Sequence, residues 1–204
     1  MKQALPGLEA VSRETAERLT AYVDLLLRWN RTINLISRRD EALVWQRHVA
    51  DAAGLVPHLP QGDDSAIDLG SGAGLPGLVL AIVTGRHFHL VESDQRKSAF
   101  LREAIRTTGA TASVHAVRIE ALRLAPVPVV TARALAPLDA LLGWAVPFLA
   151  PGGVCVFPKG RGVEAELTQA ASQWHMRVER APSATDPTAT ILRLSEIRRV
   201  RLES

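Results

Sequence analysis

The sequence predicts an α/β protein with a Rossmann-like, doubly wound sheet and a helical extension at its N-terminus. From residue 66 onward, short apolar segments alternate with amphipathic stretches, which is typical of parallel strands joined by helices. A glycine-rich turn follows the first of these apolar segments, where such folds bind ligands. The preceding residues lack this alternation and favour helices. We therefore expect an extension over residues 1–60 and a sheet domain over residues 61–204.

Two helices are expected in the extension. The first spans residues 12–29, with Ser12 as its N-cap and apolar residues recurring on one face. The second begins near Asp40 and runs to about residue 56. The prolines and polar residues of 57–64 then form a connector to the sheet domain.

Seven strands and four helices are expected in the sheet domain. The strands are predicted at residues 66–69, 87–92, 113–116, 127–132, 154–157, 176–179 and 191–194, and the helices near 76–84, 95–108, 138–149 and 162–173. Gly109 is expected to end the second of these helices. A parallel sheet of this kind binds its ligands beyond the carboxyl ends of the strands.

Composition excludes several classes of protein. The chain has 204 residues, of which 47% are hydrophobic and 22% charged, so it can bury a proper core. The one cysteine, Cys155, excludes a disulfide scaffold and a multi-cysteine zinc site. We see neither the apolar run of a secretion signal nor one of membrane-spanning length. We therefore expect a cytoplasmic protein with no membrane association and no metal, and we favour a monomer.

The positive charge is carried almost entirely by arginine. The formal net charge is +3, and the 24 basic residues comprise 21 Arg and 3 Lys. Arginine binds phosphates and stacks on bases, which favours a nucleic-acid partner, although a biased genome gives the same composition. Placement is more informative, because Arg28, Arg31, Arg38 and Arg39 lie close together with no acidic residue among them.

The segment from Ile67 to Gly77 carries the strongest local signal. A short apolar strand leads into Gly70, Gly72 and Gly74, and a helix follows. Glycine allows positive φ and lets a ligand approach the backbone, while the helix N-terminus offers unpaired N–H groups. This pattern predicts a nucleotide-like ligand.

Two classes of ligand are compatible with this loop. Residues 72–77 satisfy the dinucleotide fingerprint, with Glu92 twenty residues after Gly72 as the ribose-binding acid. The spacing Asp68-x-Gly70-x-Gly72-x-Gly74 instead resembles the first motif of class I S-adenosylmethionine-dependent methyltransferases. Glu92 serves either ligand, so the loop alone leaves an NAD(P)-dependent oxidoreductase open.

Further segments extend the resemblance along the chain. They are Trp29-Asn30 with residues 34–37, Arg47-His48 followed by Asp51, residues 67–77, residues 118–120, residues 132–134 and Lys159-Gly160. In this order they resemble the RsmG (GidB) family of bacterial 16S ribosomal RNA guanine-N7 methyltransferases. The resemblance implies a class I methyltransferase sheet, S-adenosyl-L-methionine as cofactor, and 16S rRNA in the 30S subunit or an assembly intermediate as partner. Ala53 and Ala132 stand where serine is common in the family.

The loop motif and the resemblance together predict the cofactor-binding residues. These are Asp68, Gly70, Gly72, Gly74, Leu75, Glu92, Ile119, Glu120 and Arg133. The resemblance implies that Glu92 binds the ribose and that Ile119 and Glu120 surround the adenine. Without it, Glu120 is a solvated carboxylate and Arg133 a surface residue that caps a strand end.

Methylation of guanine N7 requires no general base, because N7 has a lone pair and no proton. Catalysis then rests on positioning and electrostatics, for which Arg133, Lys159 and His48 are our candidates. The other interpretations are a basic surface turn for Lys159 and a structural, hydrogen-bonded role for His48. Cys155 lies between two valines and is expected to be an inert core thiol.

RNA contacts are expected mainly from the arginine-rich segment of the extension. The candidates are Arg28, Arg31, Asn34, Arg38, Arg39, Lys159 and Arg161. Phosphate contacts by several of these residues make binding steeply dependent on salt. A solvated loop is the alternative for this segment, and a non-catalytic ribosome-binding factor is the alternative for the whole chain.

Overall fold

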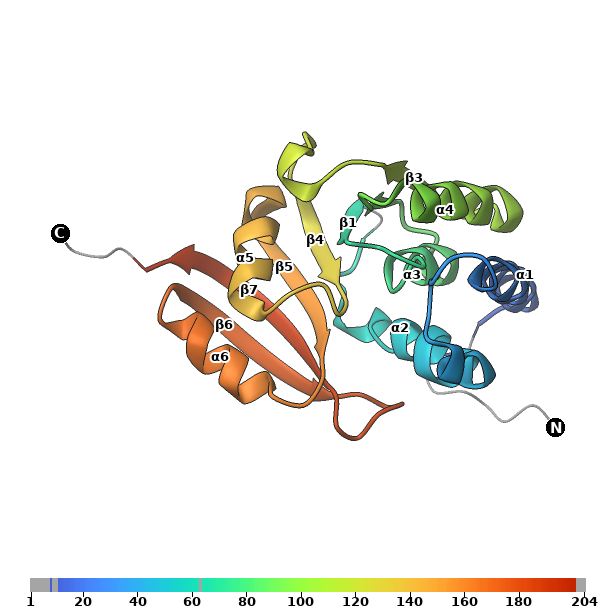
Figure 1. Ribbon diagram of the computed structural model, residues 1–204. Coiled ribbons are helices and arrows are strands. Elements are labelled where there is room, and N and C mark those ends of the chain that lie inside the picture. The colour runs from blue at the N-terminus through green and yellow to red at the C-terminus, as the bar shows by residue number, and fades with distance from the viewer. Residues whose placement is uncertain (1–7, 9–10, 63, 201–204) are drawn as a thin grey trace.

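The computed structural model describes residues 8, 11–62 and 64–200, which form a mixed seven-stranded sheet with helices on both faces (Figure 1). The strand order is β3-β2-β1-β4-β5-β7-β6. The strands are β1 Ala66–Leu69, β2 Phe88–Val91, β3 Ala112–His115, β4 Val127–Ala132, β5 Leu149–Lys159, β6 Trp174–Pro182 and β7 Thr190–Arg199. Each predicted strand is confirmed, and the last three are longer than predicted.

The sheet is parallel only in part. Strands β1 to β5 pair in parallel, whereas β7 is antiparallel to both β5 and β6. The prediction of a parallel sheet was therefore wrong for β7. A parallel pair needs a long crossover connection, and residues 183–189 between β6 and β7 are too few to form one.

The helices cover the two faces of the sheet with separate hydrophobic clusters. Helices α1 Arg13–Asn30, α3 Gly77–Thr84 and α4 Gln95–Thr108 pack with one cluster, and α5 Leu138–Ala145 and α6 Val163–Ala171 pack with the other. Ser12 caps α1 by accepting from the N–H of Thr15 at 3.1 Å, and Gly109 ends α4 in the left-handed region, as predicted. None of the helices within residues 11–62 and 64–200 has the length and apolar character needed to cross a bilayer.

The second helix of the extension is not the continuous α-helix that we predicted over residues 40–56. It is divided into a 3-10 turn at Arg38–Leu43, a π-helical turn at Trp45–Ala50, the short helix α2 at Asp51–Ala53 and a 3-10 turn at Val56–His58. Such π turns are often associated with functional sites, and this one carries His48.

The extension shares its hydrophobic core with the sheet domain. Leu19 and Tyr22 of α1 are buried in the same cluster as Leu78 of α3 and Phe100 of α4. The Tyr22 hydroxyl donates to the carbonyl oxygen of Ala73 in the glycine loop at 2.7 Å. The first helix therefore supports the loop directly.

Candidate functional site

The glycine loop joins β1, the third strand in the sheet order, to α3 at the carboxyl end of that strand. Gly72 has φ +54°, and a Cβ added there would meet only the Gly70 carbonyl oxygen, at 3.9 Å. At Gly74, with φ +85°, a Cβ would instead collide with Leu78 at 2.8 Å. Gly72 thus leaves space for a ligand, whereas Gly74 allows the helix to pack closely against the loop.

A cavity of about 360 Å³ lies beside this loop, within the size range of small-molecule sites. Six of the predicted cofactor-binding residues line it: Gly70, Gly72, Glu92, Ile119, Glu120 and Arg133. We call it the loop cavity. Lys97, Arg118 and Trp144, which we did not predict, also line it. The structure thus brings the ends of β1, β2 and β4 and the turn at residues 118–120 into one site.

Glu92 follows β2 and holds the loop in place. Its Oε2 accepts the N–H of Gly72 at 2.9 Å, and its Oε1 accepts the N–H of Asp94 at 2.8 Å. Each carboxylate oxygen has two lone pairs, so both oxygens can still accept a hydroxyl. Glu92 can therefore fix the backbone and bind a ribose at the same time.

Asp68, Gly74 and Leu75 lie outside the lining of the loop cavity. Asp68 is fully buried, and its Oδ1 accepts the hydroxyl of Thr131 at 2.8 Å. Burial raises the pKa of Asp68 to about 6, against the opposing effect of this hydrogen bond. Asp68 therefore connects β1 to β4 beneath the surface, and the predicted cofactor contacts of Asp68, Gly74 and Leu75 stay predictions.

Arg133 follows β4 and is held by the extension. Its Nη2 donates to Nδ1 of His48 at 2.6 Å, and its Nη1 donates to Oδ2 of Asp51 at 3.1 Å and to the Arg47 carbonyl at 3.3 Å. Burial, and then the charge of Arg133, lower the pKa of His48 to about 4. His48 is therefore neutral at pH 7 and can accept this hydrogen bond, as our structural interpretation of it required.

A second cavity, of about 560 Å³, adjoins the loop cavity. We call it the outer cavity. It is lined by Asp51, residues 133–137, residues 158–160, Glu166, Gln169 and Ala189. The two cavities share Arg133, Ala134 and Leu135. Ala134 has φ +51°, an uncommon conformation for a residue with a side chain that is often found at functional sites.

Lys159 ends β5 and lines the outer cavity with only 9% of its surface exposed. Its Nζ donates to Oε2 of Glu166 at 2.7 Å and to the Ala136 carbonyl at 2.9 Å. The same Glu166 oxygen accepts the N–H of Leu138 at 2.8 Å. The interpretation of Lys159 as a basic surface turn is wrong, because its ammonium group fixes the wall of the cavity.

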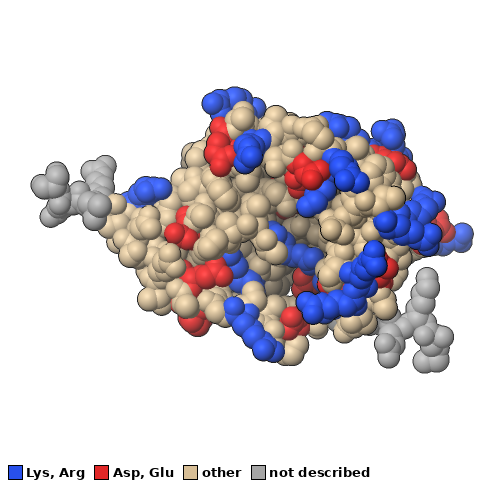
Figure 2. Space-filling model, viewed as in Figure 1, with Lys and Arg blue, Asp and Glu red and all other residues tan. Residues whose placement is uncertain are grey.

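The predicted RNA-contacting residues of the extension are all exposed. They are Arg28, Arg31, Asn34, Arg38 and Arg39, and Arg161 is also exposed beside the outer cavity. Asn30 shapes this segment: its Oδ1 accepts the N–H groups of Leu35 and Ile36, and its Nδ2 donates to Glu41. Figure 2, viewed as Figure 1, shows a hollow near the middle of the molecule with Lys and Arg side chains on both sides of it.

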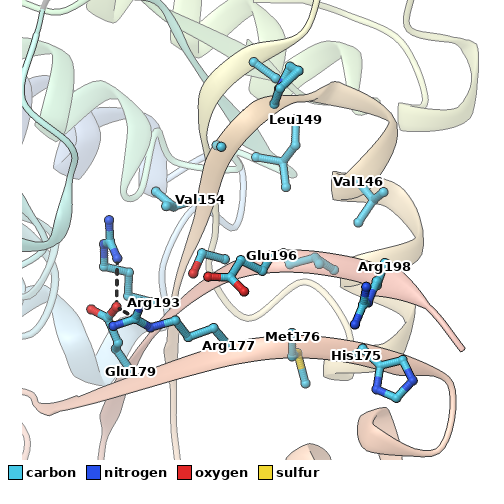
Figure 3. Close-up of a pocket in the computed structure, with 16 residues that line it drawn as sticks. Val146, Leu149, Val154, His175, Met176, Arg177, Glu179, Arg193, Glu196 and Arg198 are labelled. Atoms are coloured by element: carbon cyan, nitrogen blue, oxygen red, sulfur yellow. Dashed lines mark hydrogen bonds and ion pairs between the residues drawn. The ribbon is translucent and has the colours of Figure 1, made fainter.

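A larger cavity, of about 1200 Å³, lies at the other end of the strands (Figure 3). It is lined by the start of β5, the start of β6 and the end of β7, including Arg177, Glu179, Arg193 and Arg198. Glu179 pairs with Arg193 at 3.1 Å and with Arg177 at 3.5 Å, so these two arginines are already paired with a carboxylate of the cavity. None of the predicted site residues lines it, and size alone does not make it the functional site.

Comparison with known families identifies the chain. The family described as rRNA small subunit methyltransferase G (GidB) matches residues 15–190. The chain belongs to this family. A protein named ribosomal RNA small subunit methyltransferase G from Granulibacter bethesdensis is 56% identical over 200 residues, covering 98% of this chain and 94% of that protein. The protein of the same name from Rhodospirillum centenum is 57% identical over 187 residues, covering 92% and 87%. The predicted family is confirmed.

Solved structures confirm the predicted fold class. The N-methyltransferase NodS from Bradyrhizobium japonicum, in complex with S-adenosyl-L-homocysteine, has a TM-score of 0.57 at 14% identity and covers 86% of this chain and 98% of that one. A class I S-adenosylmethionine-dependent methyltransferase from Listeria monocytogenes has a TM-score of 0.60 at 14% identity, covering 89% and 68%. The sheet is that of a class I methyltransferase.

Proposed function

We propose that this chain transfers the methyl group of S-adenosyl-L-methionine to N7 of a guanine in 16S rRNA of the small ribosomal subunit. The observation that carries the proposal is the pair of adjoining cavities, which meet at residues 133–135 where the carboxyl ends of β1, β4 and β5 converge. In this arrangement the loop cavity takes the cofactor and the outer cavity takes the acceptor base. Membership of the rRNA methyltransferase family supports both assignments.

The residues of the loop cavity fit the cofactor. Gly72 leaves open space above its Cα, and Glu92 has acceptor capacity left for ribose hydroxyls. Ile119 offers an apolar contact for a base, with Glu120 beside it. When bound there, the cofactor supplies an electrophilic methyl group on a sulfonium.

The hydrogen bonds that Arg133 makes within the protein prevent it from covering guanine N7. The commonest arginine contact with guanine is bidentate to O6 and N7, which would occupy the atom to be methylated. Both terminal nitrogens of Arg133 are already bonded to His48, Asp51 and the Arg47 carbonyl. Both hydrogens of Nη1 are used, so Nη1 and Nη2 cannot together contact O6 and N7, while the positive charge of the guanidinium remains beside the base. Lys159 fixes the segment that follows Arg133 through the Ala136 carbonyl, and it also bonds to Glu166 in the lining of the same cavity.

Acceptor RNA contacts the exposed arginine-rich segment of the extension in this proposal. A guanine in folded rRNA must leave its stack before N7 can enter the outer cavity, and this step has an energetic cost. Phosphate contacts by Arg28, Arg31, Arg38 and Arg39 can offset part of that cost. We propose an assembly state of the 30S particle, in the cytoplasm, as the substrate.

The assignment of the loop cavity is tested by calorimetry with three ligands. We expect S-adenosylmethionine and S-adenosylhomocysteine to bind, NAD+ not to bind, and Glu92→Ala to weaken binding at least about tenfold, because the variant loses the ribose acceptor and the bond to Gly72. Glu103→Ala, which removes a carboxylate from α4 outside this cavity, is the control. Binding of NAD+ in place of the methyl donor would support the oxidoreductase instead.

A further inference from the structure

Three distant parts of the chain meet at the carboxylate of Asp51. Its Oδ2 accepts from Arg133 at the end of β4, at 3.1 Å. Its Oδ1 accepts the hydroxyl of Ser183 at 3.2 Å and that of Thr185 at 2.9 Å. Both hydroxyls belong to the connection between β6 and β7. One side chain of the extension thus joins the core sheet to a loop more than a hundred residues away.

The Asp51 carboxylate is largely shielded from solvent, which strengthens its hydrogen bonds. Its side chain is 14% exposed and that of Arg133 is 20% exposed. Hydrogen bonds to charged groups are stronger than neutral ones, and shielding limits the competition from water. The Asp51 carboxylate is therefore a junction between segments and differs from an ordinary surface ion pair.

The conformation of the β6–β7 connection depends on the same contacts. The Ser183 hydroxyl oxygen accepts the N–H groups of Thr185 and Asp186, each at 3.2 Å, while the hydroxyl donates to Asp51. The Ser183 N–H donates to the carbonyl of Ala189 at 3.1 Å, and Ala189 lines the outer cavity. Asp51 thus anchors the loop whose other end, at Ala189, lines the outer cavity.

We propose that Asp51 is a positioning residue for the acceptor base, which holds Arg133 and the β6–β7 connection in register around the outer cavity. The inference rests on the proposed function and extends it. Without the carboxylate, Nη1 of Arg133 loses its charged partner and becomes free to rotate. Arg133 can then present Nη1 and Nη2 together to guanine O6 and N7, which retains the base but covers the reacting atom. The guanine then stays bound in the outer cavity, but its N7 cannot reach the methyl group.

The loss of the Asp51 carboxylate should affect kcat and KM differently. Asp51→Asn should lower kcat for methyl transfer to unmodified 30S subunits by about 10- to 100-fold, as expected when a positioning group is lost. KM for the subunits should stay the same or fall. Affinity for S-adenosylhomocysteine should change much less than kcat, because Asp51 does not line the loop cavity and Arg133, which does, keeps its bond to His48. Asp51→Glu should recover part of kcat.

Two further variants separate positioning from folding. Ser183→Ala with Thr185→Val leaves the Arg133 bond intact and removes only the loop contacts, so it should raise KM with a smaller effect on kcat. Asp24→Asn removes the same charge from an exposed site on α1 and should have no effect. Circular dichroism and thermal melting of each variant report on the fold.

Several outcomes would overturn the inference while the proposed function stands. These are wild-type kcat in Asp51→Asn, equal losses in Asp24→Asn, or a fall in kcat matched by loss of cofactor affinity and of melting temperature. If Asp51→Asn does not fold, wild-type kinetics in the Ser183 and Thr185 double variant would also overturn the inference. No methyl transfer by the wild-type protein would instead overturn the proposed function, and the inference with it.

Discussion

At the scale of single residues, the site depends on keeping His48 neutral beside Arg133. Burial, and then the neighbouring guanidinium, lower the pKa of His48 to about 4, so that its Nδ1 accepts a hydrogen bond at neutral pH. In the unfolded chain its pKa is about 6.5. Between these values the unfolded chain binds more protons than the folded one. Stability contributed by neutral His48 is therefore present above about pH 6.5 and is lost as the pH falls towards 4.

The replacement of His48 by glutamine should reveal this linkage. The free energy of unfolding of wild-type protein, from urea denaturation, should decrease more between pH 7 and pH 5 than that of His48→Gln. Comparison at equal pH cancels the opposite effect of Asp68, whose raised pKa reduces stability as the pH rises towards 6. Identical pH dependence in the two proteins would contradict a neutral, buried His48.

The sequence predicts that residues directly after parallel strands lie close together in the structure. It does not predict contacts between side chains that are distant in the sequence and follow no such pattern. Gly70, Glu92 and Arg133 each follow a strand, and strand ends meet at one edge of a parallel sheet. Ser183 and Thr185 bond to Asp51 from 132 and 134 positions away, which no local pattern shows. Asp51 itself had a signal, because it follows His48 within one helical turn, but its partners did not.

At the scale of elements, α1 acts as a support for the glycine loop. Its Tyr22 is fully buried, and its hydroxyl donates to the carbonyl of Ala73. Burial raises the pKa of this hydroxyl well above its usual value, so that it remains a donor at any ordinary pH. The helix therefore restrains the glycine loop from within the hydrophobic core.

Loss of this one hydroxyl should be measurable in two ways. Tyr22→Phe leaves the Ala73 carbonyl without its partner in a buried site, so it should lower the free energy of unfolding by about 1–3 kcal/mol. A less restrained loop should also weaken S-adenosylhomocysteine binding several-fold in calorimetry. Full stability and full affinity in the variant would show that the loop is rigid without α1.

Periodicity predicted the regular elements well and the irregular ones poorly. Helices α1 and α4 carry capping residues and a clear apolar face, and their predicted bounds are close to those observed. The segment Arg38–His58 has apolar residues at helical spacing but is broken by 3-10 and π turns. His48 of the π turn bonds to Arg133, 85 residues away, and no local pattern shows such a contact. The short β6–β7 connection did carry a signal for antiparallel pairing, which our prediction overlooked.

At the scale of the whole molecule, the loop cavity and the outer cavity lie at one end of the sheet, and the arginine-rich segment lies in the extension that holds Arg133. The predicted boundary at residue 60 crosses a continuous hydrophobic core, because Leu55 and Ala66 belong to the same buried cluster. The extension therefore contributes to the outer cavity through Asp51, and its exposed arginines are our proposed RNA contacts.

Salt dependence tests the role of this segment. Arg31→Gln with Arg38→Gln should weaken binding to unmodified 30S subunits and reduce the slope of log affinity against log salt by about 1–2, since each phosphate contact contributes roughly 0.7–0.9. The control is Arg13→Gln with Arg106→Gln, which makes the same charge change at the start of α1 and in the last turn of α4. Equal slopes in the two double variants would show that the arginine-rich segment has no special role.

The central claim is tested most directly by methyl transfer from labelled S-adenosylmethionine to unmodified 30S subunits, with the modified nucleoside identified by mass spectrometry. The structure and the family together predict 7-methylguanosine in 16S rRNA, and its loss in Arg133→Ala, which removes the residue shared by the two cavities. A different methylated nucleoside, or no transfer by a protein that binds the cofactor, would contradict the account.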